Sequence, residues 1–391
     1  MLTQRQLFFQ HLAQTSDKPL ALEIEKAEGM YLFDVNGKRY MDLISGISVC
    51  NTGHRHPSVV NAVKEQLDKY MHLMVYGEYI QTPQVRLAAM LAEILPEQLD
   101  CTYFVNSGTE ATEGALKLAK RYTGRHEIIA FKNAYHGSTH GSLSVMGNEY
   151  FKQAYRPLLP GVHFIEFNNS VDIKFITEKT ACVIAETIQG EAGVIVPDIT
   201  YMKKLRKKCH ETGTLLILDE VQTGLGRTGK MFGFEHFGIV PDIITLAKGF
   251  GGGMPLGAFI SSKEIMNSFT NNPVLGHITT FGGHPVCCAA ALANLEVIKN
   301  EKLAESAENK GELFKKILIH PKIKSVRGKG LLLAAEMENE KTNMKIISNC
   351  IEKGLITDWF LFAPDCLRIA PPLIISENEI TEACEIILSC L

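Results

Sequence analysis

Residues 214–253 read TLLILDEVQTGLGRTGKMFGFEHFGIVPDIITLAKGFGGG, and this stretch decides the fold. Two of its runs, 214–220 and 242–247, are strand-sized and apolar on both faces. Such strands occur in parallel sheets that are covered on both sides. Asp219 lies at the end of the first run and Lys248 follows the second, a spacing that predicts about one strand–helix unit between them. Because the carboxyl ends of parallel strands face the crevice where α/β proteins bind ligands, we expect both side chains to share one ligand.

The same alternation of strands and helices extends outward from this stretch, from about residue 100 to 262. Helical patterns occupy residues 110–121 and 201–211. This alternation predicts an α/β fold whose mostly parallel central sheet is covered by helices on both sides. The further strand-sized runs are CTYFV (101–105), EIIAF (127–131), VHFIEF (162–167), ACVIAE (181–186) and LGAFIS (256–261).

The two ends of the chain have a different pattern. Residues 20–44 alternate as in a β-meander with a Val-Asn-Gly turn. A long Ala-rich helix is predicted at 284–300, followed by shorter mixed elements and a last helix. We therefore expect a large domain at 46–284 and a smaller α/β domain that combines 1–45 with 285–391, with the ligand crevice between them.

The composition argues against several classes of function. The chain has 391 residues and a net charge of −3, so neither sign of charge favours a nucleic acid or a membrane surface as a partner. No apolar run reaches transmembrane length, and the N-terminal stretch lacks the pattern of a signal peptide. The ten cysteines include no CxxC pair, which favours reduced thiols and a location in the cytoplasm.

The sequence NSGTE at residues 106–110 closes one apolar run and opens a helical pattern. Backbone N–H groups at a helix N-terminus, together with the helix dipole, favour a bound phosphate. The hydroxyls of Ser107 and Thr109 could add hydrogen-bond donors. A Ser or Thr before Glu is also a common helix N-cap, so the motif alone leaves both interpretations open.

Asp219 and Lys248 also have simpler interpretations when each is taken singly. Asp219 could cap the following helix, and Lys248 could lie in a surface loop. However, a carboxylate at the end of a buried strand requires a positive partner, and a protonated pyridine nitrogen would serve. A lysine beside a run of glycines can be partly desolvated, which makes its amine nucleophilic. Tyr135, just past the run at 127–131, could stack on a flat ring or pack in a loop.

Taken together, these motifs resemble the class III aminotransferases. This fold-type I family depends on pyridoxal 5′-phosphate (PLP) and includes acetylornithine, ornithine and 4-aminobutyrate aminotransferases. The resemblance covers nearly the whole chain and implies a PLP-dependent transaminase. The matching segments are GI through GHRHP (46–57), NSGTEATEGALKLAKRYTG (106–124), AYHGST (134–139), ETIQGEAGV (186–194), the stretch 218–258, TTFGGHPV (279–286) and LRIAPPLIIS (367–376).

The resemblance implies a role for each residue near the cofactor ring. Lys248 would bind PLP as a Schiff base and move the proton, and Asp219 would pair with the pyridinium nitrogen. Val221 would pack on one face of the ring and Tyr135 on the other, while Gln222 would reach the ring's phenolic oxygen. Two further residues that we expect at the cofactor are His136 and Glu186.

The resemblance also implies how the phosphate is bound. Gly108 and Thr109 would bind it through their backbone N–H groups, beside Ser107. Thr280 would reach the phosphate of the neighbouring subunit, so a homodimer is implied.

No metal site is expected. A nucleotide-binding protein is disfavoured, because neither GxGxxG nor GxxxxGKS/T follows a strand.

Arg368 and Glu191 are the expected substrate residues. In the family, the arginine at the position of Arg368 grips a substrate carboxylate, which suits bidentate guanidinium recognition. The glutamate at the position of Glu191 pairs with it while the amine donor is bound. Both could instead form a structural ion pair. The two residues together imply a donor without a carboxylate near Arg368, followed by a 2-oxo acid such as 2-oxoglutarate or pyruvate.

Ser138 departs from the family pattern, since many members carry an arginine there that binds a carboxylate. We therefore expect a donor whose reacting amine is terminal, or a donor carboxylate held by another residue. The alternatives are an acetylornithine or ornithine aminotransferase of arginine metabolism, and a PLP lyase or aminomutase on the same scaffold. The other residues that could hold the carboxylate are Arg55, His56 and Arg227.

Overall fold

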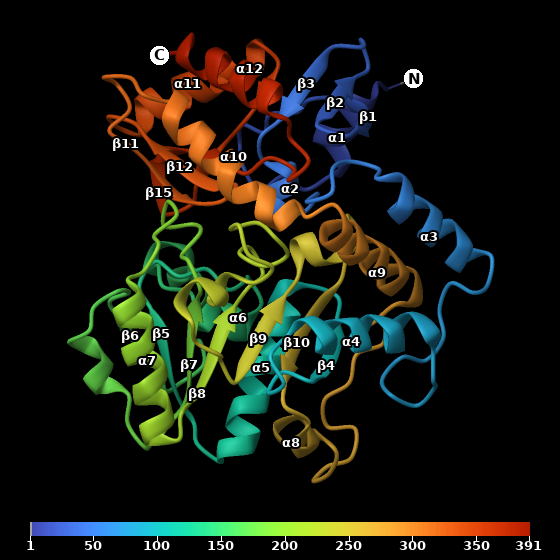
Figure 1. Ribbon diagram of the computed structural model, residues 1–391, viewed down its shortest axis with the longest axis vertical. Coiled ribbons are helices and arrows are strands. Elements are labelled where there is room, and N and C mark those ends of the chain that lie inside the picture. Colours follow the sequence, from blue (N-terminus) through green and yellow to red (C-terminus); the bar gives the residue numbers. More distant parts are fainter. Residues whose placement is uncertain (1) are drawn as a thin grey trace.

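The computed structural model describes residues 2–391 and has an upper and a lower lobe in the view of Figure 1. The lower lobe is built around one large sheet. The upper lobe contains elements from both ends of the chain, and the marked N- and C-terminal ends both lie there. Segments far apart in the sequence therefore lie side by side in the upper lobe.

The large sheet has seven strands in the order β4-β10-β9-β8-β7-β5-β6. In this order, adjacent strands from β9 to β6 run parallel, whereas β10 is antiparallel to both β9 and β4. The predicted α/β class with a mostly parallel sheet is confirmed. The strands are β4 (Cys101–Val105), β5 (Glu127–Phe131), β6 (Val162–Ile165), β7 (Thr180–Glu186), β8 (Leu215–Asp219), β9 (Ile243–Leu246) and β10 (Gly257–Ser261).

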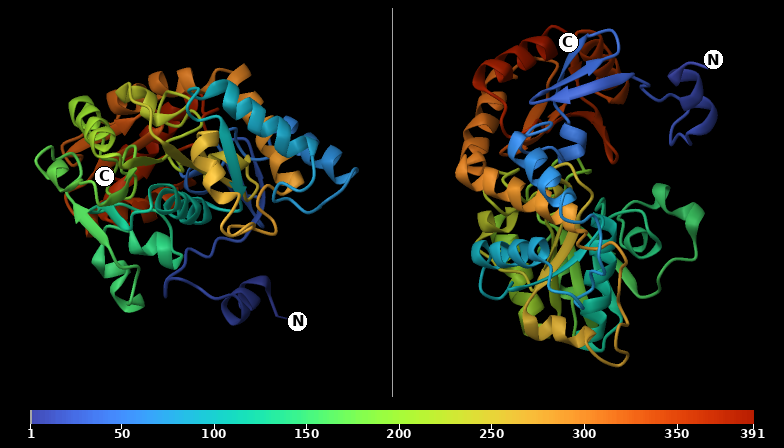
Figure 2. Two further views of the ribbon diagram at one scale, coloured as in Figure 1. Left: turned by 90° about the horizontal axis from the view of Figure 1, so that it is seen from below. Right: turned by 90° about the vertical axis from the view of Figure 1, so that its right-hand side faces the viewer.

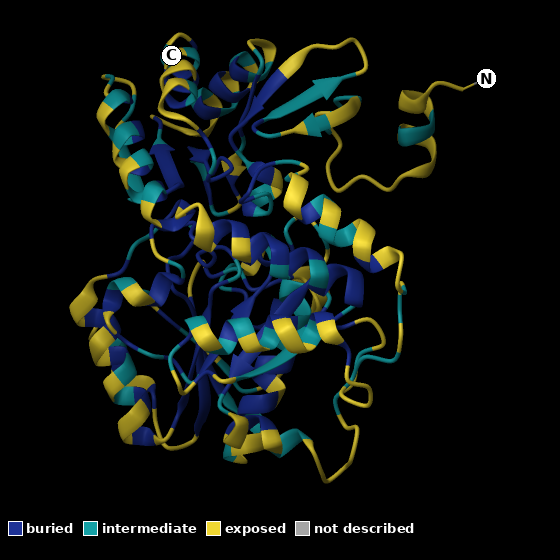
Figure 3. Ribbon diagram, turned by 45° about the vertical axis from the view of Figure 1, so that its right-hand side comes forward, coloured by how far each residue is buried: buried dark blue, intermediate teal, exposed yellow. Residues whose placement is uncertain are grey.

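Both faces of this sheet are buried, because alternate residues of each strand point to opposite sides and each side is covered. On one side Ile217 of β8 shares an apolar cluster with residues of α5 (Gly108–Thr123). On the other side Leu216 shares a cluster with residues of α7 (Ile199–Thr212). The central strands are accordingly buried along their length in Figure 3, which explains why they read as unbroken apolar runs.

The connection from β8 to β9 differs from the prediction. We expected one strand–helix unit between Asp219 and Lys248, but residues 220–242 contain only the 3₁₀ turn η4 (Gly233–Phe237). Three glycines within this connection, Gly226, Gly229 and Gly238, adopt positive φ, so the chain turns repeatedly instead of continuing a helix. Asp219 still pairs in register with Thr245, so the two strand ends remain side by side.

The orientation of β10 has a simple cause. The chain leaves β9, forms the 3₁₀ turn η5 (Lys248–Gly251) and enters β10 after only a few more residues. A parallel return requires a crossover of about a dozen residues or more, so this short connection permits only an antiparallel strand.

The predicted meander is also confirmed, since β1 (Ile24–Glu28), β2 (Tyr31–Asp34) and β3 (Arg39–Asp42) pair antiparallel in sequence. Strand β13 (Leu355–Ile356) joins β3 in parallel and so links the two ends of the chain. A third sheet, in the order β11-β12-β15-β14, completes the upper lobe. Its strands are β11 (Ser325–Lys329), β12 (Leu332–Glu336), β14 (Trp359–Phe360) and β15 (Ala363–Ile369).

Helix α9 (Pro285–Asn300) lies against α3 (Pro57–Leu67) and α4 (Thr82–Ile94). The sequence placed α9 with the smaller domain and both of its partners with the larger one, so the domain boundaries stay a prediction. The remaining helices are α1 (Gln4–His11), α2 (Ser45–Ser48), α6 (His140–Ser144), α8 (Lys263–Met266), α10 (Leu303–Ile317), α11 (Glu340–Glu352), α12 (Glu377–Leu388), η1 (Glu149–Phe151), η2 (Gln153–Tyr155), η3 (Asp172–Phe175) and η6 (Asn267–Phe269).

Helix α1 projects from the body of the molecule and buries none of its residues (Figure 2). All ten cysteines are free thiols. Within residues 2–391, no helix combines the length and the apolar character needed to span a bilayer.

Candidate active site

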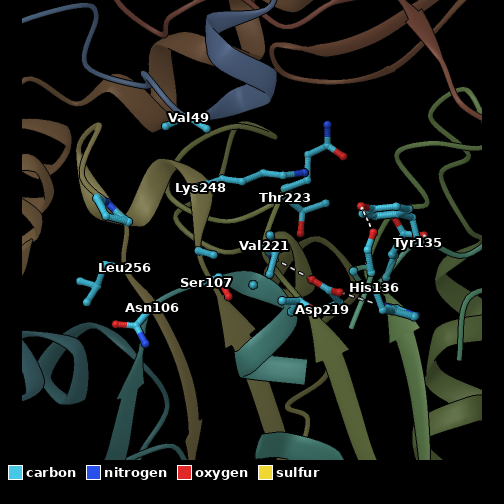
Figure 4. Close-up of a pocket in the computed structure, with 18 of the residues that line it drawn as sticks. Val49, Asn106, Ser107, Tyr135, His136, Asp219, Val221, Thr223, Lys248 and Leu256 are labelled. Atoms are coloured by element: carbon cyan, nitrogen blue, oxygen red, sulfur yellow. Dashed lines mark hydrogen bonds and ion pairs between the residues drawn. The ribbon is translucent and has the colours of Figure 1, made fainter. Parts of the chain in front are cut away.

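One pocket of about 570 Å³ lies at the carboxyl ends of β7, β8 and β9 (Figure 4). This is the edge at which the sequence predicted a ligand site. Most of the predicted site residues line it, although they come from segments far apart in the chain. The predicted residues that line it are Ser107, Gly108, Thr109, Tyr135, His136, Ser138, Glu186, Asp219, Val221, Gln222 and Lys248.

The N-terminus of α5 opens into this pocket. Ser107 is the N-cap, and its hydroxyl accepts a hydrogen bond from the N–H of Glu110 at 3.3 Å. Within residues 2–391, the N–H groups of Gly108 and Thr109 bond to no other group. A methyl group on Gly108 would lie 3.1 Å from Val221, so a larger residue would require this side chain to shift by a few tenths of an ångström. The motif therefore caps the helix and also leaves two N–H donors free for an anion.

Asp219 contacts a partner that the sequence did not predict. One carboxylate oxygen lies 2.7 Å from Nδ1 of His136, whose side chain is fully buried. The other oxygen accepts the N–H of Val221 at 2.9 Å. Nε2 of His136 is buried and has no partner within the described residues. Figure 4 shows this pair at the base of the pocket.

Lys248 follows β9 and has a left-handed backbone with φ 49°. Figure 4 shows its side chain extending into the pocket. Burial lowers the pKa of Lys248, and Arg368 lowers it further, while Glu191 opposes the shift. A lowered pKa makes the neutral amine available at a lower pH than in an exposed lysine, which suits a nucleophile or a proton acceptor.

Glu186 holds the loop that carries Tyr135. Its carboxylate accepts the N–H groups of Tyr135 at 3.1 Å and of Gly190 at 3.0 Å. Burial raises the pKa of Glu186 to about 7, although its hydrogen bonds and His136 oppose this shift. The hydroxyl of Tyr135 lies 3.3 Å from that of Ser138. The loop thus presents an aromatic ring and a neutral hydroxyl to the pocket.

Glu191 and Arg368 form a buried bidentate ion pair. Nη1 and Nη2 of Arg368 each donate to one oxygen of Glu191 at 3.0 Å. Burial would raise the pKa of Glu191, but the charge and hydrogen bonds of Arg368 lower it. Neither residue lines the pocket, but the charges of both act on the pKa of Lys248, so the pair lies near that side chain.

The structure places none of the three other candidate carboxylate-binding residues at the pocket. Arg55 is exposed, and His56 lies 3.5 Å from Glu301. Arg227 is fully buried and donates to the carbonyl of Leu331 at 3.0 Å. Each of these side chains is therefore directed elsewhere in the fold.

Thr280 is also absent from the pocket lining. It lies in the exposed segment between α8 and α9. Its predicted role concerns a neighbouring subunit, so this position is compatible with that role and does not test it.

The sequence reasoning missed a strained turn beside the pocket. The residues of α2 all have φ between 44° and 64°, which makes it one turn of left-handed helix. The N–H groups of Ile44 and Ser45 donate to Asp42 at 2.8 Å and hold its start. The turn delivers Val49 to the pocket lining and places the Ser48 hydroxyl 3.5 Å from the amide nitrogen of Gln222. Non-glycine residues rarely adopt this conformation, so no local pattern predicts it.

Comparison with known proteins gives a consistent result. A model of the family described as Aminotransferase class-III matches residues 12–391. An acetylornithine aminotransferase from Archaeoglobus fulgidus is 42% identical over 380 residues, which cover 97% of this chain and 98% of that protein. The structure of a transaminase from the marine bacterium Virgibacillus superposes with a TM-score of 0.92 at 30% identity, covering 98% of this chain and 97% of its own.

The solved ornithine aminotransferase from Toxoplasma gondii ME49 is similar as well. It superposes with a TM-score of 0.91 at 30% identity, covering 100% of this chain and 95% of its own. The fold, the residues that gather at the strand ends and these similarities agree with one another. The chain belongs to the class III aminotransferase family and is a PLP-dependent aminotransferase.

Proposed function

We propose that the enzyme transfers the terminal amino group of an N-acylated ornithine, with N-acetylornithine as the first candidate, to a 2-oxo acid such as 2-oxoglutarate. The observation that carries this proposal is the bidentate pair between Arg368 and Glu191. The name of the relative from Archaeoglobus fulgidus, acetylornithine aminotransferase, supports it. Among the functions that the sequence left open, the comparisons favour an acetylornithine aminotransferase over a transaminase for a broader range of terminal amines.

The buried pair suits a donor and an acceptor that differ in charge near the reacting carbon. A terminal amine has no carboxylate beside it, so Glu191 can keep the charge of Arg368 neutralised while the donor is bound. A 2-oxo acid has a carboxylate beside its carbonyl, and this group can replace Glu191 at the same two nitrogens. One arginine thereby serves both substrates without leaving an unpaired buried charge.

The residues that line the pocket fit the groups of PLP. The free N–H groups of Gly108 and Thr109 suit the phosphate. Asp219 offers a buried carboxylate to the ring nitrogen, and Lys248 offers an amine with a lowered pKa to the aldehyde. When bound, the cofactor supplies the electron sink for cleavage of the C–H bond. Lys248 then accepts and returns the proton, while Asp219 and Tyr135 hold the ring in place.

Ser138 favours a second candidate function, a transaminase for terminal amines that need no carboxylate. Its hydroxyl is neutral and lies 3.3 Å from that of Tyr135, so it offers a hydrogen bond instead of a fixed cation. The two candidates share the reacting group and differ in what the donor carries at its far end.

A panel of donors separates the two candidates. We expect N-acetylornithine with 2-oxoglutarate to give the highest kcat/KM among N-acetylornithine, ornithine, 4-aminobutyrate and an unbranched diamine. Pyruvate serves as the control acceptor, because it lacks the second carboxylate of 2-oxoglutarate. A kcat/KM for the diamine equal to or above that for N-acetylornithine would reject the first candidate in favour of the second.

We also propose that two copies of the chain form the active enzyme. Thr280 lies within residues 274–281, which carry exposed apolar side chains, as do residues 71–85, and both segments contribute to the lining of one cavity. Ile80 is 95% exposed and Phe281 is 54% exposed. Contiguous apolar surface of this kind marks an interaction site. A second copy would cover it and bring Thr280 to the neighbouring pocket.

Replacing Ile80 by aspartate tests this interface. An isologous interface contains each residue twice, so two buried charges would oppose association. We expect Ile80→Asp to shift the protein from dimer to monomer at micromolar concentration in analytical ultracentrifugation, with activity falling in parallel. Val171→Asp is the matched control, since Val171 is 65% exposed at the N-cap of the turn η3, outside these segments. An active monomer in the Ile80→Asp variant would contradict the proposal.

A further inference from the structure

Arg368 has a second carboxylate partner, Asp358. Its Nε donates to Oδ1 of Asp358 at 2.7 Å, whereas Glu191 is bound by the two terminal nitrogens. Asp358 lies directly before β14, and Arg368 lies on the neighbouring β15. The main chains pair as well, because the Arg368 N–H donates to the Asp358 carbonyl at 2.9 Å. Asp358 is therefore the cross-strand neighbour of the arginine.

The guanidinium group of Arg368 bonds to its own hairpin on one side. On the other side it bonds to Glu191, which a substrate carboxylate can replace. On the hairpin side, Nε bonds Asp358, Nη2 donates to the carbonyl of Trp359 at 3.0 Å, and the ring of Phe360 lies 4.2 Å from the guanidinium carbon. On the other side, Nη1 and Nη2 bond Glu191, which lies far away in the sequence. Only this second side can accept a substrate carboxylate in place of Glu191.

We propose that Asp358 is a positioning residue that fixes Nε of Arg368, so that carboxylates exchange only at the two terminal nitrogens. This inference rests on the proposed function, in which Arg368 binds the carboxylate of the 2-oxo acid. Without Asp358, the long arginine side chain would regain rotamer freedom whenever Glu191 departs, and each binding event would have to order it again.

Charge supports the same role. The Arg368 side chain is only 3% exposed, so its charge needs a permanent partner during the exchange. Asp358 supplies one, because its carboxylate bonds to no other side chain within the described residues. The replacement of Glu191 by one substrate carboxylate then leaves the total charge around Arg368 unchanged.

The carboxylate of Asp358 is not required to hold the hairpin together. The main-chain bond between Asp358 and Arg368 persists without it, and the hydroxyl of Thr357 donates to the Arg368 carbonyl at 2.7 Å. Thr357 therefore offers a matched control, because Thr357→Val removes a hairpin bond without touching the guanidinium.

The test measures the two half-reactions separately in single turnovers of the holoenzyme. We expect Asp358→Ala to raise the concentration of 2-oxoglutarate at half-saturation about tenfold or more, as for the loss of a hydrogen bond to a charged group. The donor half-reaction with N-acetylornithine should be unchanged. Asp358→Asn retains an acceptor for Nε but not the negative charge, so its half-saturation should fall between those of Asp358→Ala and the wild type. Thr357→Val should leave both half-reactions unchanged.

Binding of 2-oxoglutarate can also be followed without turnover, because the chain has a single tryptophan, Trp359, whose carbonyl bonds Arg368. We expect a titration of tryptophan fluorescence to give the same weakening in Asp358→Ala and its rescue in Asp358→Asn. The inference is overturned if Asp358→Ala binds 2-oxoglutarate like the wild type, if both half-reactions fall equally, or if asparagine does not rescue.

Arg368→Lys distinguishes a failure of this inference from a failure of the proposed function. If Arg368→Lys leaves half-saturation by 2-oxoglutarate unchanged, Arg368 does not bind the acceptor, and the proposed function fails. If Arg368→Lys weakens 2-oxoglutarate but Asp358→Ala does not, only the positioning role of Asp358 is rejected.

Discussion

Replacing Lys248 with alanine is expected to abolish amino transfer. Loss of a positioned proton-transfer group alone lowers a rate by about 10²- to 10⁴-fold, and the variant would also lose the amine that holds the cofactor. Single-turnover measurement of the donor half-reaction with N-acetylornithine checks the rate. Cofactor content after gel filtration checks retention and does not depend on turnover.

Lys152 provides a matched control for this experiment. It is a second buried lysine whose pKa is lowered by burial, and its amine donates to the Met146 carbonyl at 2.8 Å, outside the pocket. Lys152→Met should keep the half-reaction rate within a few-fold of wild type, even if the variant is less stable. A Lys248→Ala enzyme that retained more than about a tenth of the wild-type rate would refute the role assigned to Lys248.

Much of the large sheet could be predicted because its central strands are buried on both faces. The run at 127–131 matches β5 residue for residue, and β5 is buried from Ile128 to Phe131. The run at 101–105 also matches its strand, although β4 lies at the edge of the sheet and is mostly half-buried. The connection between β8 and β9 could not be predicted, because its turns depend on glycines with positive φ and on buried polar contacts. The short return into β10 was visible in the sequence, and its length could have indicated an antiparallel strand.

The candidate site was predictable to the extent that its residues end strands or open helices. Lys248 and Ser107 are of this kind. The contact of His136 with Asp219 joins residues from separate loops, so only the assembled sheet brings them together. Asp358 had no distinguishing motif, because its importance comes from register: it lies opposite Arg368 across a hairpin. Cross-strand pairing of this kind is set by the turn and not by local composition.

Asp219→Asn is expected to produce the second large effect. Removing one partner of a buried charge pair costs about 3–5 kcal/mol, and if this loss falls on the transition state it lowers kcat/KM by about 10²- to 10⁴-fold. The asparagine has nearly the same shape, and its oxygen can accept the Val221 N–H. Its NH₂ group can donate to Nδ1 of His136 when that ring carries its proton on Nε2. The fold should therefore persist, and thermal unfolding should shift little.

Glu220 directly follows Asp219 and also carries a buried carboxylate. Its replacement is a control that separates an effect on catalysis from an effect on stability. Successive residues of a strand point to opposite faces, so Glu220 points away from the pocket that Asp219 lines. Its oxygens accept the hydroxyls of Thr187 and Thr223, each at 2.7 Å, and the N–H of Gly233 at 2.8 Å. In Glu220→Gln the new NH₂ group would face donors, which costs about 1–3 kcal/mol for each unsatisfied group.

The two variants should therefore behave in opposite ways. Asp219→Asn should lose activity while its melting temperature is nearly unchanged, and Glu220→Gln should melt earlier while its folded fraction turns over at close to the wild-type rate. Calorimetry together with kcat per folded enzyme measures both quantities. If both variants lost stability and activity in proportion, the buried carboxylate of Asp219 would have a structural role. Another residue of the pocket would then have to pair with the ring nitrogen of the cofactor. If only Asp219→Asn loses turnover, the carboxylate acts on the reaction itself, as its place at the end of β8 predicts.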